Sequence, residues 1–275
     1  MNEQGVPAYD RYAAFSTRVY NGMAANLAVA TRSFGNSKSD RAYEDGYVGR
    51  VASFETYKLD TNYRLTAAAG GGSLTMSTLD AGANYYTPRA TSTSATGEQS
   101  NVDNRYQTIT VSSTTNVAIG DSFRVAALNS VHHITKQDTG QQKTFRVVGV
   151  PSSTTLIISP PMITNQVTSE AGAQYQNCVI NTKASNSAIE FLNTVTAAAN
   201  PFWQKDAIEL LPGRYSIPTD GGVAVMRGTT DQGVELVMQK WYDINTMKTK
   251  FRWDVLFGVV NKNPEHTGII QFSQT

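Results

Sequence analysis

The sequence has little of the chemistry on which disulfide-stabilised domains and metal centres depend. Its 275 residues include one cysteine, Cys178, and three histidines. A single cysteine excludes an internal disulfide framework and suits a reducing compartment, so secretion is not expected. His132 and His133 are adjacent, and adjacent side chains of a strand point to opposite faces, so the two cannot bind one metal together. We expect no metal site, and we interpret Cys178 as a small buried hydrophobe.

A long apolar run and an excess of charge of either sign are also missing. Lys and Arg number 23 and Asp and Glu number 22, which gives a formal net charge of +1. The sequence therefore has no basic field that would attract nucleic acid and no acidic run typical of a disordered tail. The first residues, MNEQGVPAYDRYAAF, lack the apolar segment of a secretory signal, and no later run approaches the roughly 20 residues of a membrane span. We expect a soluble chain with no membrane partner.

Catalytic motifs are missing as well. The sequence contains no nucleophile elbow, no paired cysteines and no zinc-binding helix. Gly70–Gly72 is not followed by GKS or GKT, which favours a flexible hinge over a phosphate loop. The clustered acids do not read as a catalytic pair, and for Asp206 and Glu209 no further acid and no apolar surroundings are apparent that would separate their pKa values for hydrolysis. These acids are Asp40, Glu44 and Asp45, read as a solvated helix face, and Asp206 with Glu209. We expect no enzymatic activity, no catalytic residue and no cofactor.

The first sixty residues read as mixed helix and strand. Val19, Met23 and Leu27 recur at helical spacing and predict an amphipathic helix from about residue 16 to residue 30, with Gly35 placed to end it. The segment VASFETYKL, residues 51–59, alternates polar and apolar side chains and predicts a strand.

From Thr66 to about Asn186 the composition changes to one rich in Ser, Thr, Gly, Asn and Gln. Short alternating runs separated by turn residues are typical of a small all-β unit, a barrel or a sandwich. The segment from Asn101 to Val125 reads as a β-hairpin, and the polar segment from Thr87 to Asn104 as an exposed, contact-making loop. The candidate strands are YQTITVS, SFRVAAL, KTFRVVGV and TTLIISP.

After Asn186 the mixed pattern returns and ends in two alternating runs. VELVMQKWYDI and FRWDVLFGVV, joined through NTMKTK, predict a long antiparallel pair. In NPFW, Phe202 and Trp203 offer an apolar anchor beside a turn. The runs are expected to place Val234, Leu236 and Met238 on one buried face of the first, and Phe251, Trp253, Val255 and Phe257 on one face of the second. An α+β domain interrupted by an all-β insert is the simplest account of these patterns.

Six segments, in order along nearly the whole chain, carry a family resemblance. They are DRYAAFSTRVYNGMAANL, GYVGRVASFETYK, NVDNRYQTITVS, HHITKQDTGQQKTFRVVGV, NPFWQKDAIELLPGR and DINTMKTKFRWDVLFGVVNKNPE. They resemble the major coat proteins of short-tailed phages typified by the Salmonella phage P-twenty-two. That family implies a Hong-Kong-97-like capsid fold with axial and peripheral domains, interrupted by an all-β insertion-domain barrel.

The resemblance implies an order of domains and a function. Residues 1–61 and 185–228 would form the two parts of the axial domain, 62–184 the β-barrel insertion domain, and 229–275 a C-terminal β segment. The function implied is that of a major capsid protein that self-assembles, as hexamers and pentamers, into an icosahedral shell around phage double-stranded DNA. The implied partners are further copies, a scaffolding protein, a portal and, without sequence specificity, the packaged DNA. The implied location is the virion capsid, after assembly in the cytoplasm of the bacterial host.

The resemblance also points to a loop that reaches a neighbouring capsomer, at Thr87 to Asn104. Its charged residues give the candidate inter-subunit contacts, Arg89, Glu98, Asp103 and Arg105. The alternative reading is that these are solvated loop charges. This loop has fewer acids than the family pattern, and exposed ion pairs contribute only about 0–1 kcal/mol each.

The chain departs from the family pattern at its start, because an arm, an extended loop and a spine helix would precede the segment NEQGVPAYDRY. We therefore expect a C-terminal portion of a coat protein, or one of two pieces, with the apolar face of the Phe251 strand left open to association. The alternative function is a β-rich phage decoration, fibre or carbohydrate-binding module, which the Ser/Thr-rich insert would permit.

Overall fold

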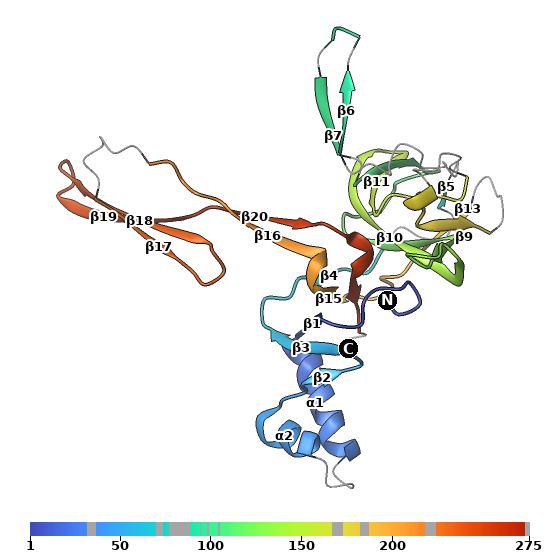
Figure 1. Ribbon diagram of the computed structural model, residues 1–275, viewed down its shortest axis with the longest axis horizontal. Coiled ribbons are helices and arrows are strands. Elements are labelled where there is room, and N and C mark those ends of the chain that lie inside the picture. The colour runs from blue at the N-terminus through green and yellow to red at the C-terminus, as the bar shows by residue number, and fades with distance from the viewer. Residues whose placement is uncertain are drawn as a thin grey trace. The chain divides into compact units, whose positions relative to one another are not determined.

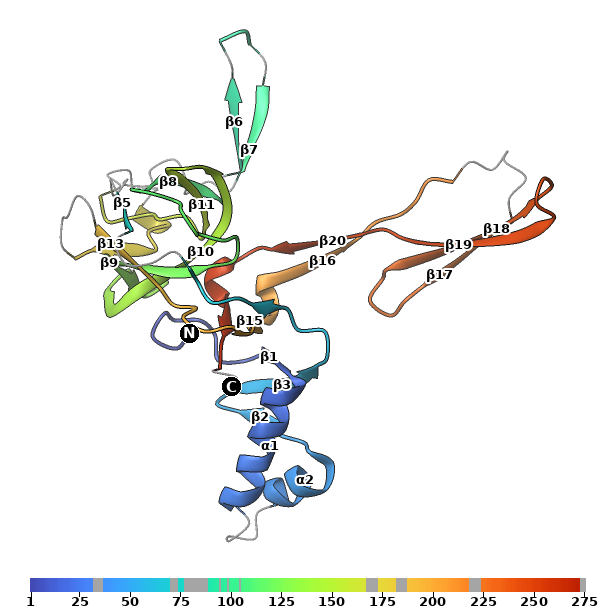
Figure 2. The ribbon, with the colours of Figure 1, turned by 180° about the vertical axis from the view of Figure 1, so that it is seen from behind.

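The chain forms two compact units. In the computed structural model the described residues are 1–31, 37–69, 74–76, 89–93, 95–97, 99–103, 105–166, 173–181, 187–217 and 224–272. The first unit comprises Met1–Lys205 with Pro264–Thr275, and the second comprises Asp206–Asn263. Figure 1 and Figure 2 show their elements from opposite sides. The predicted hinge at Gly70–Gly72 and the predicted helix stop at Gly35 lie outside the described residues.

A mixed sheet in the first unit draws its strands from both ends of the chain (Figure 1). Its order is β2-β3-β1-β15-β21. β1 runs parallel to β3 and antiparallel to β15, and β15 pairs antiparallel with β21. The strands are β1 Arg11–Ser16, β2 Arg50–Val51, β3 Phe54–Leu59, β15 Asn200–Gln204 and β21 Thr267–Ile270. Phe202 and Trp203, expected beside a turn, therefore lie inside a strand of this sheet.

Helix α1, Thr17–Thr31, packs its apolar stripe against this sheet and confirms the helix that its spacing predicts. Tyr20 and Ala24 of the helix are buried with Phe15 of β1, because residues four apart share one helix face. The Tyr20 hydroxyl accepts a hydrogen bond from the backbone N–H of Val48, 3.1 Å away. The second helix, α2, Ser37–Asp45, exposes the three acids that the sequence assigns to a solvated face. None of the helices in the described ranges has the length and apolar character that crossing a membrane requires.

The strand predicted over residues 51–59 is interrupted. A turn at Ala52 and Ser53 separates β2 from β3, and both residues adopt positive φ, 47° and 71°. Non-glycine residues adopt this conformation rarely, so alternation alone does not reveal the turn. The prediction of one continuous strand was wrong at this point.

Asn200 is a fully buried polar residue at the start of β15 that ties separate segments together. Its Oδ1 accepts hydrogen bonds from the backbone N–H of Ser16, at 2.8 Å, and from the Asn62 amide, at 3.1 Å. Its Nδ2 donates to the carbonyls of Ala198, at 3.1 Å, and Ile270, at 3.0 Å. One side chain thus joins the end of β1 to β21.

Replacing Asn200 by alanine is expected to lower the free energy of unfolding of the first unit by about 2–4 kcal/mol. The reason is that buried backbone groups would lose their partners, at about 1–3 kcal/mol each. Urea unfolding followed by circular dichroism measures the change. Asn62→Ala, which removes one of these bonds and leaves the buried backbone groups paired, should cost less than about 1 kcal/mol, and equal losses for the two variants would contradict this role.

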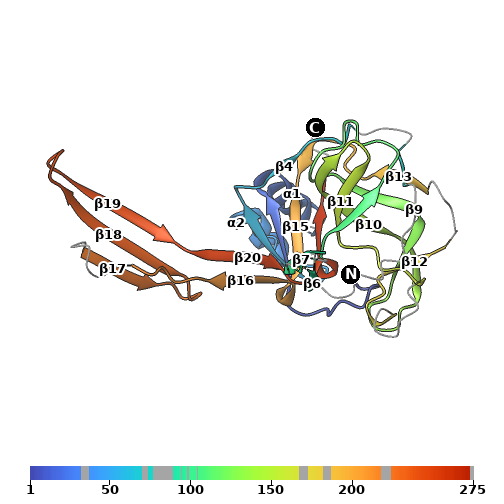
Figure 3. The ribbon, with the colours of Figure 1, turned by 90° about the horizontal axis from the view of Figure 1, so that it is seen from above.

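The middle of the first unit is a near-barrel sheet, as the alternating runs predict (Figure 3). Its order is β5-β13-β9-β10-β11-β8, with β12 paired to β9. An isolated bridge between Met76 and Val111 joins β5 to the residue after β8 and brings the two edges of the sheet together. The strands are β5 Thr75–Met76, β8 Gln107–Thr110, β9 Ser122–Val131, β10 Asp138–Ser152, β11 Thr155–Ser159, β12 Cys178–Ile180 and β13 Ser187–Phe191. The four candidate strands of the insert are β8 to β11.

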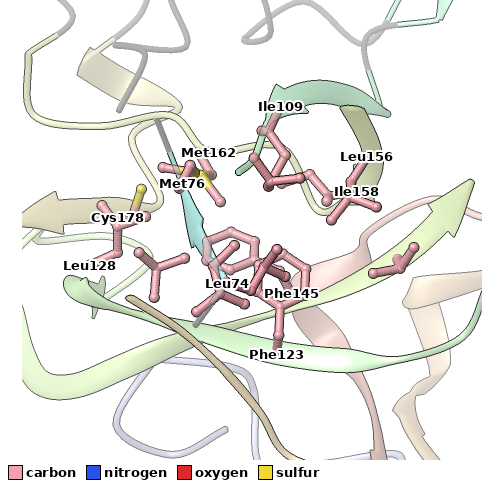
Figure 4. Close-up of a cluster of buried hydrophobic side chains, with 14 residues drawn as sticks. Leu74, Met76, Ile109, Phe123, Leu128, Phe145, Leu156, Ile158, Met162 and Cys178 are labelled. Atoms are coloured by element: carbon pink, nitrogen blue, oxygen red, sulfur yellow. The ribbon is translucent and has the colours of Figure 1, made fainter. Parts of the chain in front are cut away.

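The barrel encloses the larger apolar core of the first unit (Figure 4). Phe123 lies at its centre, fully buried, with ring centroids 5.8 Å from Phe145 and 6.4 Å from Phe191. Leu128, Met162 and other buried side chains complete the cluster. This core gives the inserted segment its own source of stability.

The hairpin predicted from Asn101 to Val125 is wrong. β8 pairs with β11, and β9 pairs with β10, β12 and β13, so the two predicted partners lie in one sheet without touching along their edges. Gly120, with φ of 100°, ends the connection, and its N–H donates to Val147 of β10 at 2.8 Å. The connection therefore crosses to another strand instead of folding back.

The remaining elements are short pairs and the sheets of the second unit. In the first unit they are β4 Arg64–Leu65 with β14 Ala197–Ala198, β6 Arg89–Thr93 with β7 Gln99–Asp103, and the 3-10 helix η4 Pro264–His266. The 3-10 helix η2 Lys205–Ala207 leads into the second unit. That unit contains β16 Ile208–Pro212 with β20 Phe257–Asn261, and the sheet of β17 Ala224–Thr229, β18 Glu235–Asp243 and β19 Lys248–Val255.

Candidate interaction surfaces

The polar segment that the sequence assigns to a loop is built largely as a hairpin. β6 and β7 pair antiparallel, and Arg89 lies directly opposite Asp103 in their register. Two of the four predicted contact residues are thus brought together at the base of one hairpin. Arg105 follows it, half-buried, with its guanidinium 5.7 Å from the centre of the Tyr106 ring. Glu98 lies outside the described residues.

The sheet β17-β18-β19 of the second unit has one face that is largely apolar and open. The register places Met226, Met238 and Trp253 side by side across the three strands. Because side chains alternate along a strand, every second residue from these lies on the same face. We call this set the apolar face: Met226, Leu236, Met238, Tyr242, Phe251, Trp253 and Val255. Trp253 is 61% exposed. Lys240 is also on this face, 5.9 Å from the Phe251 ring centre.

The opposite face of the same sheet carries paired charges. Hydrogen-bonded ion pairs join Arg227 to Glu235 at 2.9 Å and Lys250 to Asp243 at 2.7 Å. The hydrogen bonds from Lys250 and Thr246 lower the pKa of Asp243 to about 2. We call this set the charged face: Arg227, Glu235, Asp243, Lys250, Arg252 and Asp254, with Trp241 among them. Each of the six charged residues has an ion-pair partner within the sheet.

Little of the second unit is buried. Among its described residues the buried hydrophobic side chains are Ala207 and Val237. Val237 lies on the charged side of β18, so the prediction that Leu236 and Met238 would be buried was wrong in phase. The predicted antiparallel pair is confirmed as β18 with β19, although the second run divides at Leu256 into β19 and β20. Exposed contiguous apolar faces of this kind are typical of interaction surfaces.

The comparison with known families covers almost the whole chain. The family model described as "P22 coat protein - gene protein 5" matches residues 1–273. The chain belongs to the P22 coat protein family. It is therefore a structural capsid protein, as the sequence motifs indicate. The coat protein I-domain of phage CUS-3 is 37% identical over 46% of this chain and 99% of that domain, with a TM-score of 0.30.

The cysteine and one of the acids considered as candidate reactive groups have contacts that explain them structurally. Burial raises the pKa of the Cys178 thiol to about 12, so it remains protonated at neutral pH. Glu209 forms an ion pair with Lys262 at 3.4 Å on the β16–β20 pair. Within the described ranges no group of three or more His, Cys, Asp or Glu side chains is placed to hold a metal ion.

The sequence analysis grouped the apolar residues of each strand on one face, but it missed the paired charges of the opposite face of this sheet. The charged residues Arg227, Glu235, Asp243 and Asp254 indicate this second face, because the strand register places all four on the same side of the sheet. The sequence alone does not reveal it, because β18 carries apolar residues on both of its faces: Val237 and Trp241 on one, Leu236 and Met238 on the other.

Proposed function

We propose that this chain is a major capsid protein whose copies assemble, as hexamers and pentamers, into an icosahedral shell around phage double-stranded DNA. The apolar face carries the proposal, since coat protein that covers it on assembly would gain about 1.5–3 kcal/mol for each large side chain fully buried. Modest energies repeated over many symmetric contacts suffice for a stable shell. The paired charges of the opposite face would not resist such association.

The proposed arrangement is Hong-Kong-97-like. Residues 1–61 and 185–228 would form the axial domain, 62–184 the insertion domain and 229–275 the C-terminal β segment. Two features support this division: the sheet of the first unit takes strands from both flanks, and the barrel lies between them in sequence. Residues 62–192, which extend the proposed insertion domain far enough to include β13, should show a cooperative β-type melt when expressed alone, and a disordered spectrum would count against the division.

The assembly experiment is sedimentation and negative-stain microscopy of the chain expressed with its co-encoded neighbours. Shells or capsomers are the expected result, and a strict monomer would contradict the proposal. Co-purification would test the proposed scaffolding and portal partners, and nuclease protection the enclosed DNA. Particles recovered from the cytoplasmic fraction of the bacterial host would support the proposed place of assembly.

We also propose that the β6–β7 hairpin makes a contact between capsomers through Arg89, Glu98, Asp103 and Arg105. The opposition of Arg89 and Asp103 in the register supports a role for both at one place. Opposite charges directly across an antiparallel pair contribute roughly 0.2–1 kcal/mol, and like charges are destabilising.

Exchanging the charges of Arg89 and Asp103 distinguishes an effect on the hairpin itself from an effect on the contact between capsomers. Arg89→Glu alone should lower assembly by weakening both. The double variant Arg89→Glu with Asp103→Arg restores opposite charges across the hairpin but reverses their positions towards a neighbour, so assembly should stay low. Sedimentation velocity measures the assembled fraction. Full recovery in the double variant would show that the charges serve only the hairpin.

A further inference from the structure

Three segments that are distant in sequence meet at residues 132–137, the turn between β9 and β10. The backbone N–H of His133 donates to the carbonyl of Gln4 at 2.8 Å. Gly5, on the same N-terminal loop, lies against the His132 ring, since a Cβ at Gly5 would be 2.6 Å from His132 Nε2. The His133 and His266 rings meet edge to face, 5.5 Å apart at 68°. The N-terminal loop and η4 thus both dock on this barrel turn, and we call the three segments together the histidine joint.

His132 holds the backbone of the turn through one ring nitrogen. Its Nδ1 accepts hydrogen bonds from the N–H groups of Ile134, at 3.3 Å, and Thr135, at 3.2 Å. An acceptor needs its lone pair, so Nδ1 carries no proton in this arrangement and Nε2 carries the only one. A proton added to Nδ1 would remove both hydrogen bonds, because the N–H at Nδ1 would then face the N–H groups of Ile134 and Thr135. The conformation of the turn is therefore coupled to the protonation of His132.

The His133–His266 pair lies beside a buried ion pair. Lys143 Nζ contacts Glu265 Oε1 at 2.9 Å, and the two side chains are 5% and 20% exposed. Lys136 Nζ donates to the carbonyl of Gln176 at 3.0 Å; burial lowers the pKa of Lys136, while Glu265 raises it and Lys143 lowers it. Two lysines therefore already face one glutamate. A proton on either ring would add positive charge where it is not balanced.

The charged and titratable groups around the joint come from every element packed on it. They are His132, His133 and Lys136 of the turn, Asp138 and Lys143 of β10, Glu265 and His266 of η4, the Met1 amine and Glu3 of the N-terminal loop, and Arg11 of β1.

We propose that the histidine joint is proton-sensitive, holding the N-terminal loop and η4 on the barrel while its histidines are neutral and releasing them when these are protonated. The direction follows from the contacts, because the neutral ring is the form that accepts the turn hydrogen bonds. Free histidine changes charge between about pH 5 and pH 8. The joint is thus closed while its histidines are neutral and opens as they gain protons.

Hydrogen exchange of the full chain, read by mass spectrometry at pH 7.5 and pH 5.5 and corrected for intrinsic rates, tests the proposal. Peptides spanning residues 132–137 should lose about tenfold in protection at the lower pH. His132→Asn supplies an amide oxygen near the position of Nδ1 but does not titrate, so its turn should be nearly insensitive to pH. A wild-type pH response in His132→Asn would overturn the role of His132.

Two further measurements keep the outcome decisive. The double variant His133→Phe with His266→Phe keeps two aromatic rings that carry no titrating proton, so exchange of η4 should no longer respond to pH. The turn and the N-terminal loop, which His132 contacts, should respond as in the wild type. Peptides from β9 serve as the internal reference, and their equal loss of protection would mean general unfolding and would overturn a local joint. In the wild type, ring nitrogen NMR should show an unprotonated Nδ1 at His132 at pH 7.5; a protonated Nδ1 would overturn the proposal without any substitution.

Discussion

Replacing Trp253 by glutamate is expected to abolish assembly, whereas the same replacement of Trp241 should leave most of it intact. The two tryptophans are 61% and 53% exposed and belong to the same sheet, but Trp253 lies on the apolar face and Trp241 on the charged face. A carboxylate buried without a partner costs several kcal/mol, and each 1.4 kcal/mol is a tenfold change in an association constant. The assembled fraction in sedimentation velocity should therefore fall at least a hundredfold for Trp253→Glu.

The matched pair makes this result easy to interpret. Trp253→Ser removes the aromatic surface without adding charge and should give an intermediate loss, which separates lost contact from the burial of charge. Equal loss of assembly in Trp241→Glu and Trp253→Glu would show that the two faces are equivalent and would contradict the assignment of the apolar face.

The second large effect is expected in the barrel. Phe123→Ala should lower the free energy of unfolding of the barrel by about 3–5 kcal/mol, because it removes a fully buried ring and leaves a cavity between Phe145 and Phe191. Thermal unfolding followed by near-ultraviolet circular dichroism measures the loss. Subunits should then be recovered mainly as aggregate.

Ile119→Ala is the control for this substitution, since Ile119 is exposed in the same unit and its truncation should change stability by less than about 0.5 kcal/mol. Phe123→Leu, which keeps most of the volume, should fall between the two. A loss of less than 1 kcal/mol for Phe123→Ala would show that the barrel core is not the source of the stability of the insert.

Strand existence could be predicted from the sequence, and strand pairing could not. Alternation with a period of two located β8 to β11, because each has one face in a common core. The choice of partner depends on contacts between distant segments, such as the pairing of Leu156 with Ile109, which no local pattern contains. The turn at Ala52 and Ser53 was not predicted for a related reason, since neither residue type indicates positive φ.

The candidate surfaces were predictable only in part. The open apolar run around Phe251 and Trp253 was visible as alternation, and both side chains are exposed. The hairpin of β6 and β7 was not visible, because its Ser and Thr residues carry no apolar period that would distinguish a strand from a loop. Consequently the opposition of Arg89 and Asp103 could be found only from the register.

The mixed sheet that joins both ends of the chain implies an order in which the parts of the subunit can fold during synthesis. β13 completes the barrel at Phe191, whereas β21, the last strand of the mixed sheet, ends at Ile270, about 80 residues later. At about 5–20 residues per second, a ribosome needs roughly 4–16 s to cover that distance. During that interval the nascent chain can hold a finished barrel while the mixed sheet of β1, β3 and β15 still lacks β21. The inserted barrel is therefore the part of the subunit that can fold completely before the surrounding mixed sheet is complete.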